Sequence, residues 1–76
     1  MILYHIHFEF KEEVDKRKQD YYVRTDKDIS VFMDESINYE SENISFIDAD
    51  EDFVYINLSE VRLFWAARES KGDAVA

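Results

Sequence analysis

The sequence predicts a mainly β fold, with a small antiparallel sheet of about five short strands, curled or barrel-like. Apolar and polar residues alternate with a period of two over several short runs, as in strands that are buried on one face. Val, Ile, Phe and Tyr dominate these runs, while Asp, Asn and Ser separate them, a pattern typical of antiparallel hairpins. The 76 residues include no proline and only one glycine, so Asp, Asn and Ser must form the turns.

The first ten residues predict a strand. The apolar residues that would form one face of this strand are Ile2, Tyr4, Ile6, Phe8 and Phe10. The opposite face would carry His5, His7 and Glu9, because side chains two residues apart in a strand point the same way.

The next segment, residues 11–20, has one apolar side chain, Val14. One valine cannot hold a helix against a core, so we expect a solvated loop with at most one helical turn. Residues 21–25 are expected to return as a second strand. Residues 28–34 alternate Ile29, Val31 and Met33 with other residues, which predicts a third strand.

Two further strands are expected at residues 44–48 and 53–57, where β-branched and aromatic residues are concentrated. The polar residues 35–43 would form a turn-like connection before them. The acidic segment DADED, residues 48–52, would form the tight turn between them.

The last element has two interpretations. Four residues alternate as they would in a strand that begins near residue 61: Val61, Leu63, Trp65 and Ala67. The alternative is a helix over residues 58–71, which would make the fold α+β. Asn57 could cap the start of that helix and Gly72 could end it.

The composition is that of one compact acidic domain, residues 1–71, followed by a frayed tail, residues 72–76. Hydrophobic residues make up 46% of the chain and aromatic residues 16%, which is too apolar for a disordered acidic chain. The chain has no cysteine, which suits a reducing compartment, so we expect a cytoplasmic protein. The N-terminal segment lacks the pattern of a signal peptide. The longest apolar run, residues 63–67, is far shorter than the roughly 20 residues of a membrane span.

The negative charge is unevenly distributed. The net charge is −9, and residues 29–61 contain nine acidic residues and no Lys or Arg. We expect these carboxylates to lie on loop tips and one sheet face, as a common patch. Such a patch repels nucleic acid and anionic membranes and attracts a basic protein surface. The alternative is that the acidic surface only confers solubility.

The candidate partner-binding residues combine this charge with aromatic side chains that could anchor a partner. They are Asp48, Asp50, Glu51, Asp52, Glu40, Glu42, Tyr39 and Tyr55. Trp65 is expected in the core or in a homodimer interface.

No catalytic, metal or cofactor site is predicted. The row His5, His7 and Glu9 could offer metal ligands, but we interpret it as the solvent-facing side of a strand. The DADED segment begins like a calcium loop, yet Phe53 stands where an EF-hand requires glycine. The serines lack a glycine-flanked nucleophile turn, and there is no glycine-rich phosphate loop.

The resulting hypothesis is a non-enzymatic interaction module that binds a basic protein. Its small size and dense acidity are typical of inhibitors from bacteriophages and mobile elements that imitate nucleic acid and block a nucleic-acid-handling protein. The alternative is a self-assembling structural or regulatory subunit, in which exposed strand edges and the Trp65 region pair between copies.

Overall fold

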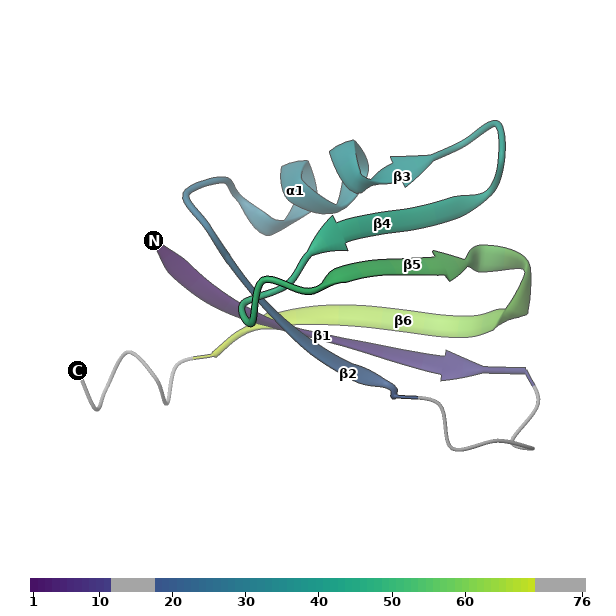
Figure 1. Cartoon of the computed structure of the whole chain (residues 1–76), viewed down its shortest axis with the longest axis horizontal. Helices are drawn as coiled ribbons and strands as arrows, with labels where there is room; N and C mark the ends of the chain where they lie inside the picture. The colour runs from purple at the N-terminus through teal and green to yellow at the C-terminus, as the bar shows by residue number, and fades with distance from the viewer. Residues whose placement is uncertain (12–17, 70–76) are drawn as a thin grey trace.

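The computed structural model describes residues 1–11 and 18–69. In this part of the chain, six strands form two three-stranded antiparallel sheets, accompanied by one α-helix and one 3-10 turn (Figure 1). In chain order the elements are β1 (Ile2–Phe10), β2 (Asp20–Thr25), α1 (Ile29–Ser36), β3 (Ile37–Asn38), β4 (Asn43–Ile47), β5 (Phe53–Asn57), η1 (Leu58–Glu60) and β6 (Val61–Arg68). The predicted mainly β antiparallel fold is confirmed. The strands form two sheets, however, and the sheets do not close into a barrel.

The first sheet has the order β2-β1-β6 and the second has the order β3-β4-β5. β1 lies in the middle of its sheet and pairs antiparallel with β2 on one side and β6 on the other. The strands predicted at residues 21–25, 44–48 and 53–57 correspond to β2, β4 and β5, each within one residue at either end. The expectations for residues 12–17 and for the tail at 72–76 lie outside the described residues.

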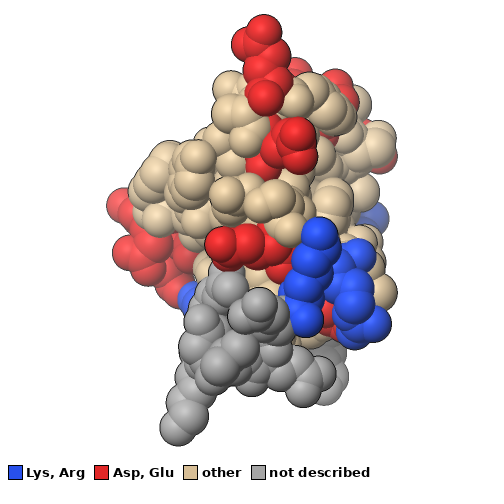
Figure 2. Space-filling model, turned by 90° about the vertical axis from the view of Figure 1, so that its right-hand side faces the viewer, with Lys and Arg blue, Asp and Glu red and all other residues tan. Residues whose placement is uncertain are grey.

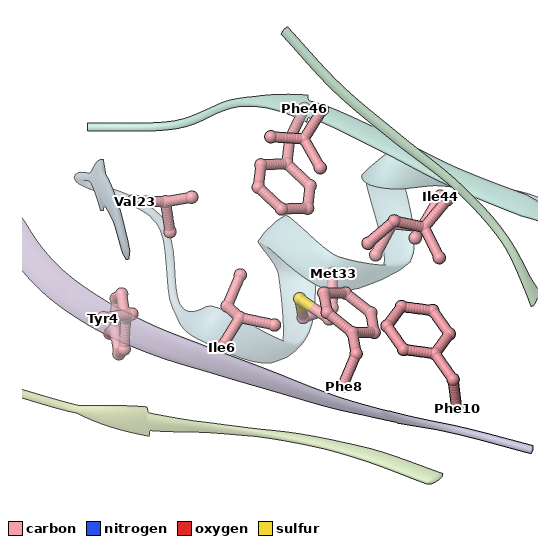
Figure 3. Packing of buried hydrophobic residues seen from close by; sticks show 10 residues of the cluster. Tyr4, Ile6, Phe8, Phe10, Val23, Met33, Ile44 and Phe46 are labelled. Carbon is pink, nitrogen blue, oxygen red and sulfur yellow. The ribbon is translucent and has the colours of Figure 1, made fainter. Parts of the chain in front are cut away.

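The core lies between the two sheets and α1 (Figure 3). It contains the predicted apolar face of β1 from Tyr4 to Phe10, and the partners that other elements contribute are Val23, Met33, Ile44, Phe46, Val54 and Ile56. Phe8, Ile6, Ile44 and Val23 are fully buried. Burying a side chain of this size contributes about 1.5–3 kcal/mol relative to leaving it in water.

Residues 29–36 form a helix, so the strand predicted at 28–34 is wrong. The Asp28 carboxylate accepts a hydrogen bond from the Ser30 backbone N–H and caps the helix start. Ile29, Phe32 and Met33 then share one face and pack on the core, as the i, i+3, i+4 spacing allows. Val31 points to solvent, although strand alternation would place it beside Met33.

The C-terminal element is a strand, which decides between the two interpretations. Asn57 does act as a cap, because its side-chain oxygen accepts a hydrogen bond from the Ser59 N–H at 3.0 Å. It caps only the short η1 turn. The chain then pairs with β1, where Phe64 lies opposite Phe8 and Trp65 opposite His7.

The β4–β5 hairpin is fastened to the first sheet at its turn and is closed at its open end. The Ala49 N–H donates to the carbonyl oxygen of Tyr22 in β2 at 2.7 Å, and the Leu58 N–H donates to the carbonyl oxygen of Glu42 at 2.8 Å. The first bond fixes the hairpin turn relative to the first sheet, and the second continues the β4–β5 ladder beyond the pair Asn43 and Asn57. Within the described part of the chain, α1 is much too short to cross a membrane.

Candidate functional site

The predicted carboxylates fall into two groups rather than one patch. Asp48, Asp50, Glu51 and Asp52 lie in the β4–β5 turn, whereas Glu40 and Glu42 lie in the β3–β4 loop. The five residues of β4 separate these two connections, a span of about 17 Å at the usual rise of a strand. Figure 2 shows Asp and Glu side chains in several separate groups on one face of the molecule. The expectation of a single common patch is therefore corrected, because the two turns lie at opposite ends of the same strand.

The β4–β5 turn is organised by Asp48. Asp48 Oδ1 accepts hydrogen bonds from the backbone N–H groups of Asp50 and Asp52, each at 2.9 Å. Glu51 adopts a positive φ of 67°, which closes the turn. Asp48 is only 7% exposed and holds the turn together, so the carboxylates that can meet a partner here are those of Asp50, Glu51 and Asp52.

The β3–β4 loop is organised by Asn38. Its side-chain oxygen accepts hydrogen bonds from the backbone N–H groups of Glu40 at 3.0 Å and Ser41 at 3.1 Å. Glu42 has a φ of 56° and its carbonyl oxygen binds the η1 turn. The backbone is thus tied inward, while both glutamate side chains remain exposed.

Two other carboxylates of residues 29–61 already have partners. Glu35 forms an ion pair with Lys27. Asp34 accepts a hydrogen bond from the Tyr39 hydroxyl at 2.6 Å, and this bond raises the pKa of Tyr39 above its ordinary value. Tyr39 therefore has an exposed ring whose hydroxyl is held beside α1.

An apolar surface lies between the two acidic groups, and of its three residues the sequence predicted only Tyr55 as a partner-binding residue. Ile47 and Phe53 are directly opposite each other across the β4–β5 ladder, and Tyr55 follows on the same side of the sheet. Their exposed fractions are 57%, 67% and 60%. The Tyr55 hydroxyl accepts a hydrogen bond from Asn43 Nδ2 at 2.9 Å, which orients the ring. We call Ile47, Phe53 and Tyr55 the hairpin face.

The sequence of residues 53–56 does not indicate which side of the strand is exposed. Residues 53–56 read Phe-Val-Tyr-Ile, which is apolar at every position. Such a run predicts a strand but does not say which side is buried. The structure buries Val54 and Ile56 and leaves the other two residues outside.

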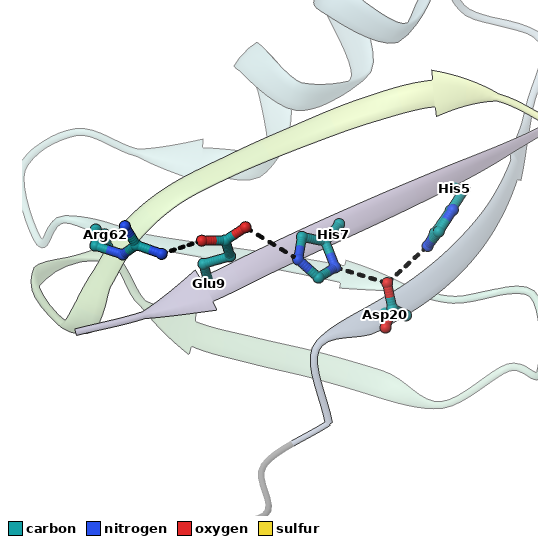
Figure 4. A network of polar contacts seen from close by, with 5 residues as sticks. All are labelled: His5, His7, Glu9, Asp20 and Arg62. Carbon is teal, nitrogen blue, oxygen red and sulfur yellow. Dashed lines mark hydrogen bonds and ion pairs between the residues drawn. The ribbon is translucent and has the colours of Figure 1, made fainter. Parts of the chain in front are cut away.

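A second cluster lies on the outer face of the first sheet (Figure 4). His5 and His7 share this face, as predicted, and both imidazoles donate to the same atom, Asp20 Oδ1. The His5 Nε2 distance is 2.8 Å and the His7 Nδ1 distance is 2.7 Å. Glu9 lies 3.6 Å from the other ring nitrogen of His7 and forms an ion pair with Arg62 of β6. Three strands are therefore connected by one polar network.

Aromatic rings pack around these histidines. His5 stacks on Tyr22 with ring centroids 4.8 Å apart, and Trp65 lies 5.1 Å from each imidazole. The hydrogen bond from His7, followed by that from His5, lowers the pKa of Asp20 below its ordinary value of 3.8. Trp65 is thus a surface residue that packs on the histidines and not a core residue.

Among the described residues, one group of carboxylates and imidazoles has its ligand atoms within 4.8 Å of one another, namely Asp48, Asp50 and Asp52. Asp48 Oδ1 already accepts two backbone N–H groups, which explains this proximity as turn geometry. His5, His7 and Glu9 do not form such a group, because the two imidazoles turn to Asp20.

Comparisons of the chain with protein-family models, with curated proteins and with solved structures found no match.

Proposed function

We propose that this protein is a non-enzymatic interaction module that binds a basic protein through the hairpin face and the acidic groups at its two ends. The observation that carries the proposal is the position of Ile47, Phe53 and Tyr55 between two sets of exposed carboxylates. Exposed apolar side chains of this size, rimmed by charge, are typical of binding surfaces.

The division of roles follows from the range of each force. Carboxylates attract a cationic partner over distances up to about a Debye length, roughly 8–10 Å at physiological salt. Apolar and aromatic side chains act only on contact and provide most of the affinity when they are buried at the centre of an interface. The hairpin face has this arrangement, with Phe53 at its centre and Asp50 and Asp52 beside it.

Proteins that handle nucleic acid are one class of basic partner, since their binding grooves are lined with Lys and Arg. In this specific form of the proposal, the module occupies such a groove and inhibits the protein. The net charge of −9 disfavours direct binding to nucleic acid.

The test is affinity capture from a cell lysate, identification of the partner by mass spectrometry, and titration of the purified partner at low and high salt. We expect affinity to fall with salt. Neutralising two turn carboxylates, Asp50→Asn with Asp52→Asn, should weaken binding about 3- to 10-fold. Phe53→Ala should weaken it about tenfold or more, with little change in the salt dependence.

The matched control removes the same charge elsewhere, Asp26→Asn with Glu69→Gln. If this control weakens binding as much as the turn variant, the attraction depends on net charge and not on the hairpin face. If Phe53→Ala binds as the native protein does, the proposed surface is wrong. Competition by duplex DNA tests whether the module occupies a nucleic-acid-binding groove. If it does, DNA and the module cannot bind the captured partner at the same time.

A further inference from the structure

One side of β6 has no strand partner in the described part of the chain. β6 lies at the edge of the sheet order β2-β1-β6. The Glu69 N–H donates to the Leu3 carbonyl oxygen at 2.9 Å, and hydrogen-bonded pairs alternate along an antiparallel ladder. Odd-numbered residues of β6 therefore bond to β1, whereas the backbone N–H and C=O groups of Phe64 and Ala66 point away from it.

This edge is also apolar. Leu63, Phe64 and Trp65 are consecutive and all exposed, so apolar side chains emerge from both faces of the strand. A pocket adjoins the beginning of the strand, and its lining residues are Leu58, Val61, Arg62, Leu63 and Phe64. Natural edge strands are usually protected by Lys, Pro or inward-pointing charges, and the stretch from 63 to 67 has none.

The charge of β6 indicates what can pair with it. Residues 61–68 contain no carboxylate and two arginines, Arg62 and Arg68, in a chain of net charge −9. Arg62 is paired with Glu9 of β1, and without a carboxylate of its own this strand lacks the attraction for a basic partner that the hairpin face offers. A second copy of the chain can approach it without bringing carboxylates together.

We infer that two copies of this protein pair antiparallel along β6 and form a continuous six-stranded sheet. The two-fold axis passes through Phe64, so that Phe64 of each copy lies opposite its equivalent. This register places Leu63 opposite Trp65 of the second copy, next to the pocket. The inference is independent of the proposed binding of a basic protein.

The first test is sedimentation equilibrium of the full chain over a concentration series. We expect the mass to approach twice the 9.1 kDa of one chain. Ala66→Pro removes a backbone N–H that faces the second copy but no hydrogen bond to β1, so it should give a folded monomer. Phe53→Lys on the hairpin face is the control and should leave the dimer intact, which separates this surface from the proposed partner site.

The second test uses the absence of cysteine and remains informative if Ala66→Pro fails to fold. Phe64→Cys places two thiols across the axis, where Cα atoms of a hydrogen-bonded pair lie about 5.5 Å apart and within reach of a disulfide. In air-saturated buffer, where dissolved oxygen is the oxidant, we expect rapid oxidation of the two thiols to a disulfide-linked dimer, whereas Phe53→Cys should stay mostly monomeric. A native mass of 9.1 kDa at every concentration would overturn the inference. So would a native dimer in which Phe64→Cys does not cross-link.

Discussion

At the scale of single residues, Asp20 connects the two histidines on the outer face of the first sheet. One of its oxygens accepts hydrogen bonds from both His5 and His7, which lie two residues apart on the same face of β1. This requires a proton on His5 Nε2 and on His7 Nδ1, so the shared carboxylate fixes the orientation of both rings. The rings in turn support Trp65 and Tyr22.

The lowered pKa of Asp20 predicts how its contribution to stability depends on pH. A carboxyl group whose folded-state pKa is depressed stabilises the protein above its unfolded-state pKa and loses this effect as pH falls through the folded-state pKa. Asp20→Asn should therefore lower the Tm at pH 6, and the difference from the native protein should shrink below pH 3.8.

Thermal unfolding followed by circular dichroism between pH 6 and pH 2 measures this difference. Glu40→Gln is the control, since it removes one exposed negative charge and leaves the histidines untouched. A difference between native protein and Asp20→Asn that stays constant down to pH 2 would contradict the assignment.

At the scale of elements, α1 shows how one stretch of sequence can satisfy two patterns. Ile29, Val31 and Met33 alternate as in a strand, while Ile29, Phe32 and Met33 share a helical face. The Asp28 cap favours the helix at its start. Packing on β4 completes the choice, because Phe32 lies against Phe46 with ring centroids 6.0 Å apart.

Substitutions at two positions of α1 distinguish the strand pattern from the helical pattern through the free energy of unfolding. Met33→Ala should destabilise the protein by about 2 kcal/mol or more, because it leaves a cavity beside the core. Val31→Ala should change the free energy of unfolding by less than about 0.5 kcal/mol, because the side chain is exposed. Urea denaturation gives both values. Equal losses at the two positions would indicate a shared buried face, as in a strand.

At the scale of the whole molecule, a small chain depends on a few fully buried side chains. A domain of 76 residues has a free energy of unfolding of about 4–11 kcal/mol. Phe8 is completely buried and packs against Phe10, Tyr21 and Phe64. It thereby joins all three strands of the first sheet.

Phe8→Ala should cost about 3–5 kcal/mol and leave the protein at or near the limit of folding. Phe53→Ala removes the same side chain from an exposed site and should cost less than about 0.5 kcal/mol. Far-UV circular dichroism with denaturant titration measures both. A large loss of stability in Phe53→Ala would mean that the hairpin face is part of the folded core and not a binding surface.

Several features of this protein were determined by the sequence alone. The period-two pattern of residues 1–10 defined β1, its buried face and the shared side of His5 and His7. The polar residues 48–52 defined the turn before β5. These features follow from neighbours along the chain, because strand geometry sends alternate side chains to opposite faces.

The tertiary structure decided the rest, because it depends on residues far apart in the chain. Glu9 and Arg62 are 53 positions apart, and Asn43 and Tyr55 are 12 apart. The exposure of Phe53, the pairing of β6 with β1 and the separation of the acidic residues into two groups all result from such long-range contacts. Local periodicity indicates that a segment is extended, but only the packing of distant elements decides which of its sides meets solvent.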